Sequence, residues 1–124
     1  MAGTVTITYP VSHLPIKMVE WTWVSDASGD VSGTDTGELN GMALRWVTNP
    51  GSTAPTDDYD ITVLDEDGVD IASGGLGDRD TSNSEQFIPG GDADPGAAFN
   101  GKLSLVVSNA GNAKEGVLKL YYRG

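Results

Sequence analysis

His13 is the residue that most readily suggests catalysis, because it is the only histidine among the 124 residues. A Ser-His-Asp triad would need it as the general base. Ser12 precedes it, but neighbouring residues of an extended segment point to opposite faces. His13 also lies in a connector bracketed by Pro10 and Pro15. The sequence therefore predicts an ordinary loop or interface histidine and a protein that is not an enzyme.

Two clusters of carboxylates could in principle supply the paired acids of a glycosidase, at residues 57–60 and 65–70. Both clusters fall at hairpin ends or on the polar face of a predicted strand. The aromatic residues that could stack on a sugar are limited to Trp21, Trp23 and Trp46, and two of these alternate on one strand, as core residues do. We expect no glycosidase activity.

Calcium binding is the better alternative for the acidic turn Asp65-Glu66-Asp67-Gly68. The turn resembles part of a calcium loop, but the D-x-[DN]-x-[DN]-G spacing and the closing Glu are missing. Residues 26–35 and 92–94 also offer oxygen ligands. Turn formation by Asp and Gly explains these segments more simply, so no metal or cofactor is predicted. The chain has no cysteine, which excludes disulfides and thiolate metal sites.

The segment 59–72 indicates the kind of element that holds these groups. Tyr59, Ile61 and Val63 alternate with polar residues, which predicts a half-buried strand. Asp67-Gly68 supplies the turn of a hairpin. The sequence thus predicts two strands, at 58–64 and 69–72, joined by an acidic turn.

Seventeen glycines and six prolines divide the chain into short alternating segments without a helical stripe. The predicted fold is all-β: a single-domain β-sandwich, jelly roll or small barrel of about eight short strands. Gly41 is expected to mark a bulge. The predicted strands cover residues 4–9, 16–24, 39–48, 58–64, 69–72, 84–88, 102–108 and 115–123.

The whole chain, residues 1–124, is expected to form one domain, in which residues 1–15 are an N-terminal arm or an edge strand. Strand alternation predicts the buried side chains of its core. These are Trp21, Trp23, Tyr59, Ile61, Leu103, Leu105, Leu118 and Leu120.

The net charge of −11 limits the possible partners. An excess of carboxylates repels nucleic acid and anionic lipid, so neither is expected to bind. The apolar runs are too short to span a membrane, and no secretory signal is visible, which predicts synthesis in the cytoplasm. The charge serves solubility, or it favours docking onto a less acidic or basic surface.

Three segments carry a resemblance to a known group of proteins: WVSDASGDVSG (23–33), PTDDYDITVLDEDGVDIASG (55–74) and LVVSNAGNAKEGVLKLYYR (105–123). The chain resembles small virion proteins of tailed bacteriophages, encoded in the head-gene cluster. The resemblance implies a non-enzymatic capsid decoration (cement) protein. It also implies a position on the capsid exterior, the major capsid protein as partner, and a homotrimer. No functional residue is carried over from these proteins.

An N-terminal segment of this kind can add a strand to the open sheet edge of a neighbour. The predicted partner interface therefore comprises Thr4, Thr6, Thr8, Tyr9, Pro10, His13, Leu14, Pro15 and Ile16. Two alternatives remain open. One is another virion component, such as a head-tail joining, tail or head-fibre protein. The other is a carbohydrate-binding β-sandwich, in which Trp21, Trp23 or Trp46 would be exposed in a row.

Overall fold

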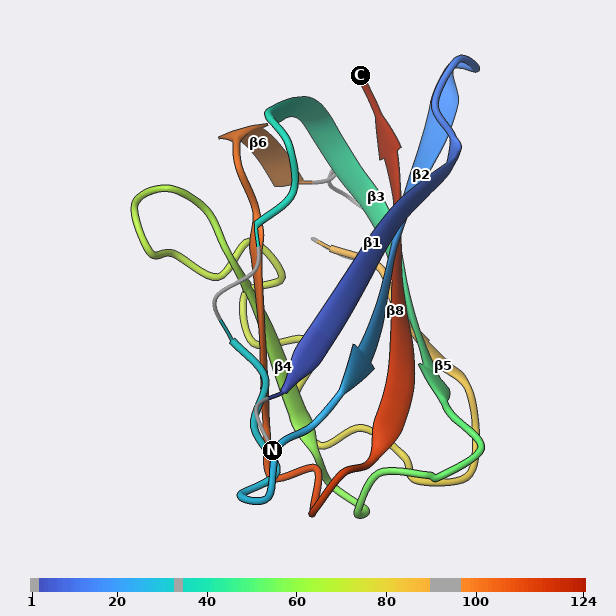
Figure 1. The fold of residues 1–124 in the computed structure, drawn as a ribbon. Coiled ribbons are helices and arrows are strands. Elements are labelled where there is room, and N and C mark those ends of the chain that lie inside the picture. The colour runs from blue at the N-terminus through green and yellow to red at the C-terminus, as the bar shows by residue number, and fades with distance from the viewer. Residues whose placement is uncertain (1–2, 33–34, 90–96) are drawn as a thin grey trace.

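The chain folds into strands and turns, without a helix among the residues that the structure describes (Figure 1). The structure is a computed structural model, and it describes residues 3–32, 35–89 and 97–124. The predicted all-β fold is confirmed. The strands are β1 (Thr4–Val11), β2 (Ile16–Val24), β3 (Leu39–Pro50), β4 (Asp60–Leu64), β5 (Glu85–Phe87), β6 (Ala97–Gly101), β7 (Ser104–Ser108) and β8 (Glu115–Arg123).

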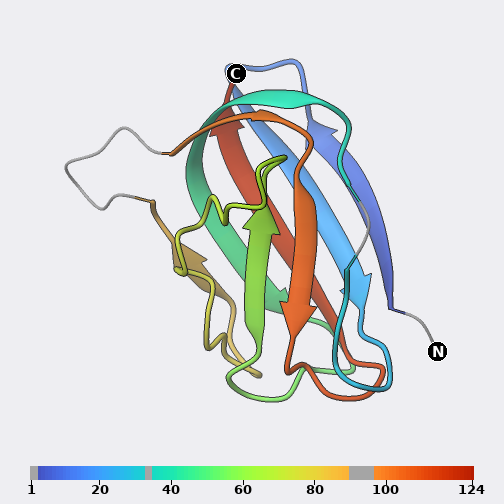
Figure 2. The ribbon, with the colours of Figure 1, turned by 90° about the vertical axis from the view of Figure 1, so that its left-hand side faces the viewer.

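Two antiparallel sheets face each other as a β-sandwich (Figures 1 and 2). The larger sheet has the order β1-β2-β8-β3-β5, and β6 pairs with the first part of β3. The smaller sheet consists of β4 and β7, which lie in front of the larger sheet in Figure 2. The strand order is not sequential, so the large sheet is built from segments that are distant in the chain.

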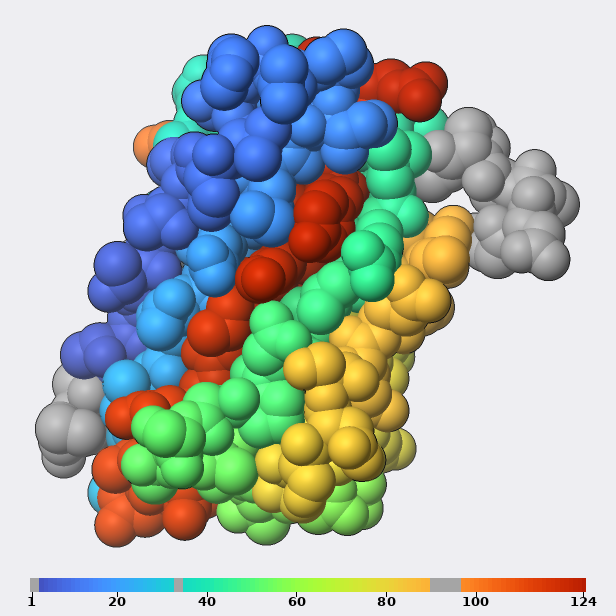
Figure 3. Space-filling view, turned by 90° about the vertical axis from the view of Figure 1, so that its right-hand side faces the viewer, coloured from blue at the N-terminus to red at the C-terminus, as the bar shows by residue number. Residues whose placement is uncertain are grey.

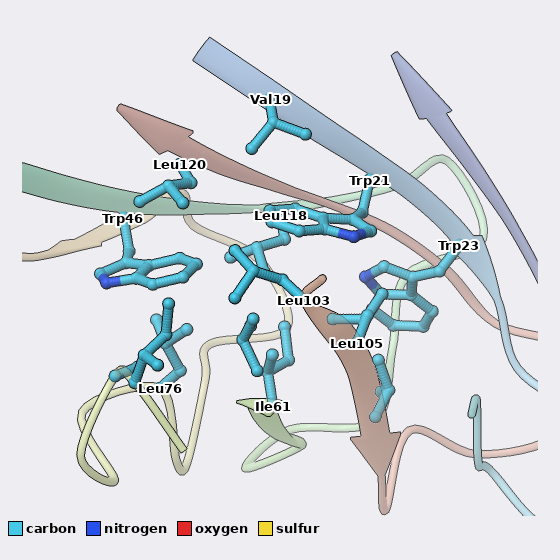
Figure 4. Packing of buried hydrophobic residues seen from close by; sticks show 14 of the residues in the cluster. Val19, Trp21, Trp23, Trp46, Ile61, Leu76, Leu103, Leu105, Leu118 and Leu120 are labelled. Carbon is cyan, nitrogen blue, oxygen red and sulfur yellow. The ribbon is translucent and has the colours of Figure 1, made fainter. Parts of the chain in front are cut away.

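The core lies between these two layers and contains all eight predicted residues, each no more than 1% exposed. The large sheet contributes alternate residues of β2 and β8, as the period-2 pattern predicted. Trp21 stacks on Trp46 with ring centroids 6.3 Å apart (Figure 4). The ring centroid of Trp23 lies 5.7 Å from that of Tyr59. The three indoles therefore fill the centre of the sandwich.

The predicted alternation fails in β3. Strict alternation over the predicted strand 39–48 places Met42, Leu44 and Trp46 on one face, but Ala43 and Trp46 are its fully buried hydrophobic residues. The register against β8 shifts between Ala43 and Arg45, which places the bulge at Leu44 and not at Gly41. Gly41 has a different role, because a Cβ there would collide with the backbone carbonyl of Arg123.

The predicted strand at 69–72 is also wrong, although the acidic turn before it forms. The Asp65 N–H donates to the Val69 carbonyl over 3.0 Å, and one bridge joins Leu64 to Asp70. The Asp70 carboxylate then accepts bonds from the backbone N–H groups of Val63, Ala72 and Gly74. These bonds draw the chain into consecutive turns, because a side-chain acceptor competes with the ladder of a strand.

Strand β6 was missed, since residues 89–101 were expected to form a loop. Residues 90–96 lie outside the described residues, but residues 97–101 pair with residues 39–43 of β3. The other strands agree with the prediction within a few residues, and the bounds of β2 and β8 agree fully. Within the described ranges, no helix is long and apolar enough to cross a membrane.

Burial of Tyr59 gives the fold a dependence on alkaline pH. Desolvation raises the pKa of Tyr59 to about 12 in the folded chain, against about 10 in an unfolded one. The unfolded chain therefore loses this proton first, so the stabilisation is complete below pH ~10 and declines by roughly 2–3 kcal/mol up to pH ~12.

Tyr59→Phe is expected to remove this part of the alkaline decline. Urea unfolding followed at a series of pH values would measure it, with Tyr121→Phe on the outer face of β8 as the matched control. An equally steep decline in Tyr59→Phe and the control would contradict the assignment.

Candidate docking surface

Residues 4–11 form the edge strand β1 of the large sheet and do not extend as a separate arm. β1 pairs with β2 from Thr4↔Val24 to Val11↔Met18, with a register shift between Thr8 and Val11, around Pro10. Val5 and Ile7 pack against the core, while Thr4, Thr6 and Thr8 are exposed. Among the residues that the structure describes, no strand pairs with the outer edge of β1.

The small sheet offers less open edges. Val31 and Asp35 form bridges along the free side of β7. Arg79 forms a bridge to Tyr59, just before β4, and Asp70 forms a bridge to Leu64, at the end of β4. Among the described residues, no such bridge forms along β1, so β1 is a long open edge. Open edges of this kind can accept a strand from another chain.

The turn between β1 and β2 carries a group of exposed apolar side chains. Tyr9, Leu14 and Ile16 are 41%, 52% and 41% exposed, and they are three of the five large hydrophobic residues exposed in the described part of the chain. His13 and the two prolines that bracket it are exposed beside them. The structure thus brings all nine predicted interface residues to the surface, on one edge strand and its following turn.

A cleft of about 300 Å³ lies beside this turn. The Tyr9 hydroxyl accepts a bond from the Gly37 N–H over 3.1 Å, and Lys17 Nζ donates to the Gly124 carbonyl over 2.7 Å. Burial, and secondarily the nearby Tyr9, raise the pKa of Tyr122. The sequence did not predict that side chains of β3 and β8 would line this cleft. The lining residues are Tyr9, Ser12, Lys17, Glu38, Leu39, Asn40, Tyr122 and Gly124.

The carboxylates considered for chemistry hold turns in place. Asp26 accepts bonds from the N–H groups of Ser28 and Asp30, and Asp65 accepts bonds from those of Asp67 and Val69. Asp80, which was not among the candidates, accepts bonds from the N–H groups of Ser82 and Asn83 in the same way. Backbone bonds, from Asp30 to Asp26 and from Ser82 to Asp80, lower the pKa of both aspartates. These oxygens are therefore engaged by the backbone, as the turn interpretation predicted.

The remaining chemical candidates do not assemble into a site within the described residues. His13 is exposed on the β1–β2 turn. No group of three or more His, Asp or Glu side chains that could hold a metal ion occurs in the described ranges, and Asp92 and Asp94 lie outside them.

The tryptophans do not form the exposed row expected of a carbohydrate-binding sandwich. Trp21, Trp23 and Trp46 are each 0% exposed, because their strands turn these side chains toward the small sheet. The condition that the carbohydrate-binding alternative placed on the tryptophans is not met, and a sugar could not stack on these indoles without opening the core.

No protein-family model matches the chain, and no curated protein matches it either. Among solved structures, a cupin domain from Bordetella pertussis Tohama I is 12% identical, with a TM-score of 0.37, and the match covers 100% of this chain and 98% of that one. A structure described as a carbohydrate-binding module of the β-sandwich superfamily is 14% identical, with a TM-score of 0.42. That match covers 99% of this chain and 55% of that chain. Likenesses this low carry no argument about function.

Proposed function

We propose that this chain is a non-enzymatic virion structural protein that decorates the outside of a tailed-phage shell. The protein binds the major capsid protein and forms a homotrimer. The resemblance of three segments to phage virion proteins supports the proposal. The single structural observation that carries it is the group of exposed apolar residues, Tyr9, Leu14 and Ile16, next to the open edge of β1.

The chemistry of this region suits contact with another protein. Residues 3–19 contain no Asp or Glu, although the chain carries eighteen of them. β1 and its turn therefore bring no carboxylate of their own to a docking protein. Apolar side chains at the turn gain from burial, and the backbone of β1 can pair with an added strand.

Leu14→Ser combined with Ile16→Ser is expected to weaken binding to the shell by about tenfold or more, because two exposed apolar side chains lose their contact. The matched control is Val69→Ser, since Val69 is 57% exposed but lies at the acidic turn near β4. The measurement mixes purified protein with shells that lack it and follows binding and the heat resistance of the particles.

Equal binding by the double variant and the control would remove the β1–β2 turn from the interface. Absence of binding to any shell by the unmodified protein, or electron density only at the tail or portal vertex, would refute the decoration role. Density at those places would favour the alternative of a head-tail joining, tail or head-fibre component.

A second candidate function is carbohydrate binding in the cleft beside the turn. The observation that favours it is the exposed ring of Tyr9 next to the polar side chains of Lys17, Glu38 and Asn40. An aromatic face with a few convergent polar groups is the usual composition of a small-molecule site. Heat released on titration with oligosaccharides, and lost in Tyr9→Ala, would favour this candidate over decoration.

A further inference from the structure

Figure 3 shows the outward face of the large sheet, on which β1, β2, β8, β3 and β5 lie side by side. Its composition contrasts with the acidic character of the whole chain, which has a net charge of −11. Val19, Leu120 and Trp46 point into the core, so the residues next to them in β2, β8 and β3 point outward. Met18, Tyr121 and Arg45 form one row across these three strands, and Glu20, Lys119 and Val47 form the next.

Cations are concentrated on this face. Arg45, Lys119 and Arg123 are three of the seven Lys and Arg residues of the chain. Glu20 is the carboxylate among them, whereas Glu115 lies at the other end of β8 and accepts a bond from Ser52 over 3.1 Å.

None of the three cations is paired with a carboxylate within the described part of the chain, where the ion pair present is Arg79–Glu85. Arg45 instead lies 5.2 Å over the Tyr121 ring and donates to Gln86 over 2.7 Å. Arg, Tyr and Met are enriched in the contacts between proteins, and the face offers all three. A partner surface that carries carboxylates would complement the unpaired cations of this face.

The same chain offers such a surface around the start of β4. Asp58 lies next to Asp57, and its pKa is raised first by that neighbour and then by burial and by Asp78, Asp60 and Asp80. The cation of this cluster, Arg79, has a side chain only 14% exposed and lies 3.8 Å from Glu85. The carboxylates at this end therefore repel one another, and Arg79 beside them is already paired with Glu85.

We propose that the outward face of the large sheet in one copy docks onto the acidic start of β4 in a second copy. The contact joins two different surfaces, so copies can continue head to tail and close into a ring, of which a trimer is one example. At physiological ionic strength, charges farther apart than about 8 Å are largely screened, so the net charge of −11 opposes the contact less than the adjacent pairs favour it.

The inference rests on the proposed function in one respect, namely that the protein forms an oligomer. Its test uses purified protein without shells, so that its failure and the failure of the decoration role can be distinguished. The face variant is Lys119→Glu with Arg123→Glu, and the acidic-end variant is Asp57→Lys with Asp58→Asn. Asp67→Lys is the matched control, because Asp67 is exposed at the opposite end of β4.

Sedimentation velocity over a concentration series is expected to show oligomers for the unmodified protein and Asp67→Lys, and about tenfold or more weaker association for each double variant. Circular dichroism would verify that every variant is folded. A mixture of the two double variants should associate more tightly than either variant alone, because each retains one intact surface.

Three outcomes would overturn the inference. The unmodified protein could be monomeric at every concentration. The acidic-end variant could associate as well as the unmodified protein, which would mean that two like faces meet. The mixed variants could also associate no more tightly than either variant alone while both remain folded.

Discussion

Leu105→Ala is expected to lower the free energy of unfolding by about 2–5 kcal/mol. Leu105 lies in the middle of β7, opposite Val63 of β4, and is 0% exposed. It belongs to the packed cluster between the two sheets shown in Figure 4. The small sheet has two strands, so a side chain lost from it leaves a cavity that few neighbours can fill.

Urea unfolding followed by circular dichroism would measure this loss. Leu14→Ala is the matched control, because the same side chain at position 14 is 52% exposed and should cost less than about 0.5 kcal/mol. Similar losses in both variants would contradict the inward orientation of β7.

The strands that sequence patterns predicted best are those with two clearly different faces. β2 and β8 pair along their full length without a register shift, so period-2 alternation holds from end to end. In β3 the bulge at Leu44 reverses the alternation. The sequence contains no signal for it, because it depends on the register against β8 and not on the local residues.

β6 shows the opposite case, in which pairing overrides weak local preference. Residues 97–101, AAFNG, include two alanines and a glycine, which are poor strand formers. They form a strand because β3 extends beyond β5 and pairs with them. Such non-local stabilisation is not visible in the segment itself.

The nine predicted interface residues could be placed at the surface from sequence, because they lie in an alternating strand and a proline-marked turn. The cleft and the cationic face could not. Glu38 reaches the cleft from the loop before β3, Asn40 from β3 itself and Tyr122 from β8. Arg45 and Tyr121 meet across the β3–β8 pair. These neighbours follow from the strand order β1-β2-β8-β3, which the sequence does not reveal.

Asp70→Ala is expected to destabilise the fold by about 2–4 kcal/mol, because the carboxylate accepts three backbone bonds and charged acceptors contribute about 1.5–3 kcal/mol each. Asp70 Oδ1 lies 3.1 Å from the Val63 nitrogen and 3.0 Å from that of Ala72, and Oδ2 lies 2.9 Å from that of Gly74. The total stays below the sum of three bonds, since the exposed Gly74 N–H can bond to water.

The matched control is Asp67→Ala, three residues earlier in the same acidic segment, where the side chain is exposed. It should change the free energy of unfolding by less than about 0.5 kcal/mol. Asp70→Asn should fall between the two, because its amide oxygen can still accept the Val63 and Ala72 bonds while its NH₂ group cannot accept from Gly74. Thermal and urea unfolding of the three variants would test this order. Equal losses in Asp67→Ala and Asp70→Ala would mean that the turn is maintained by its net charge rather than by the carboxylate of Asp70.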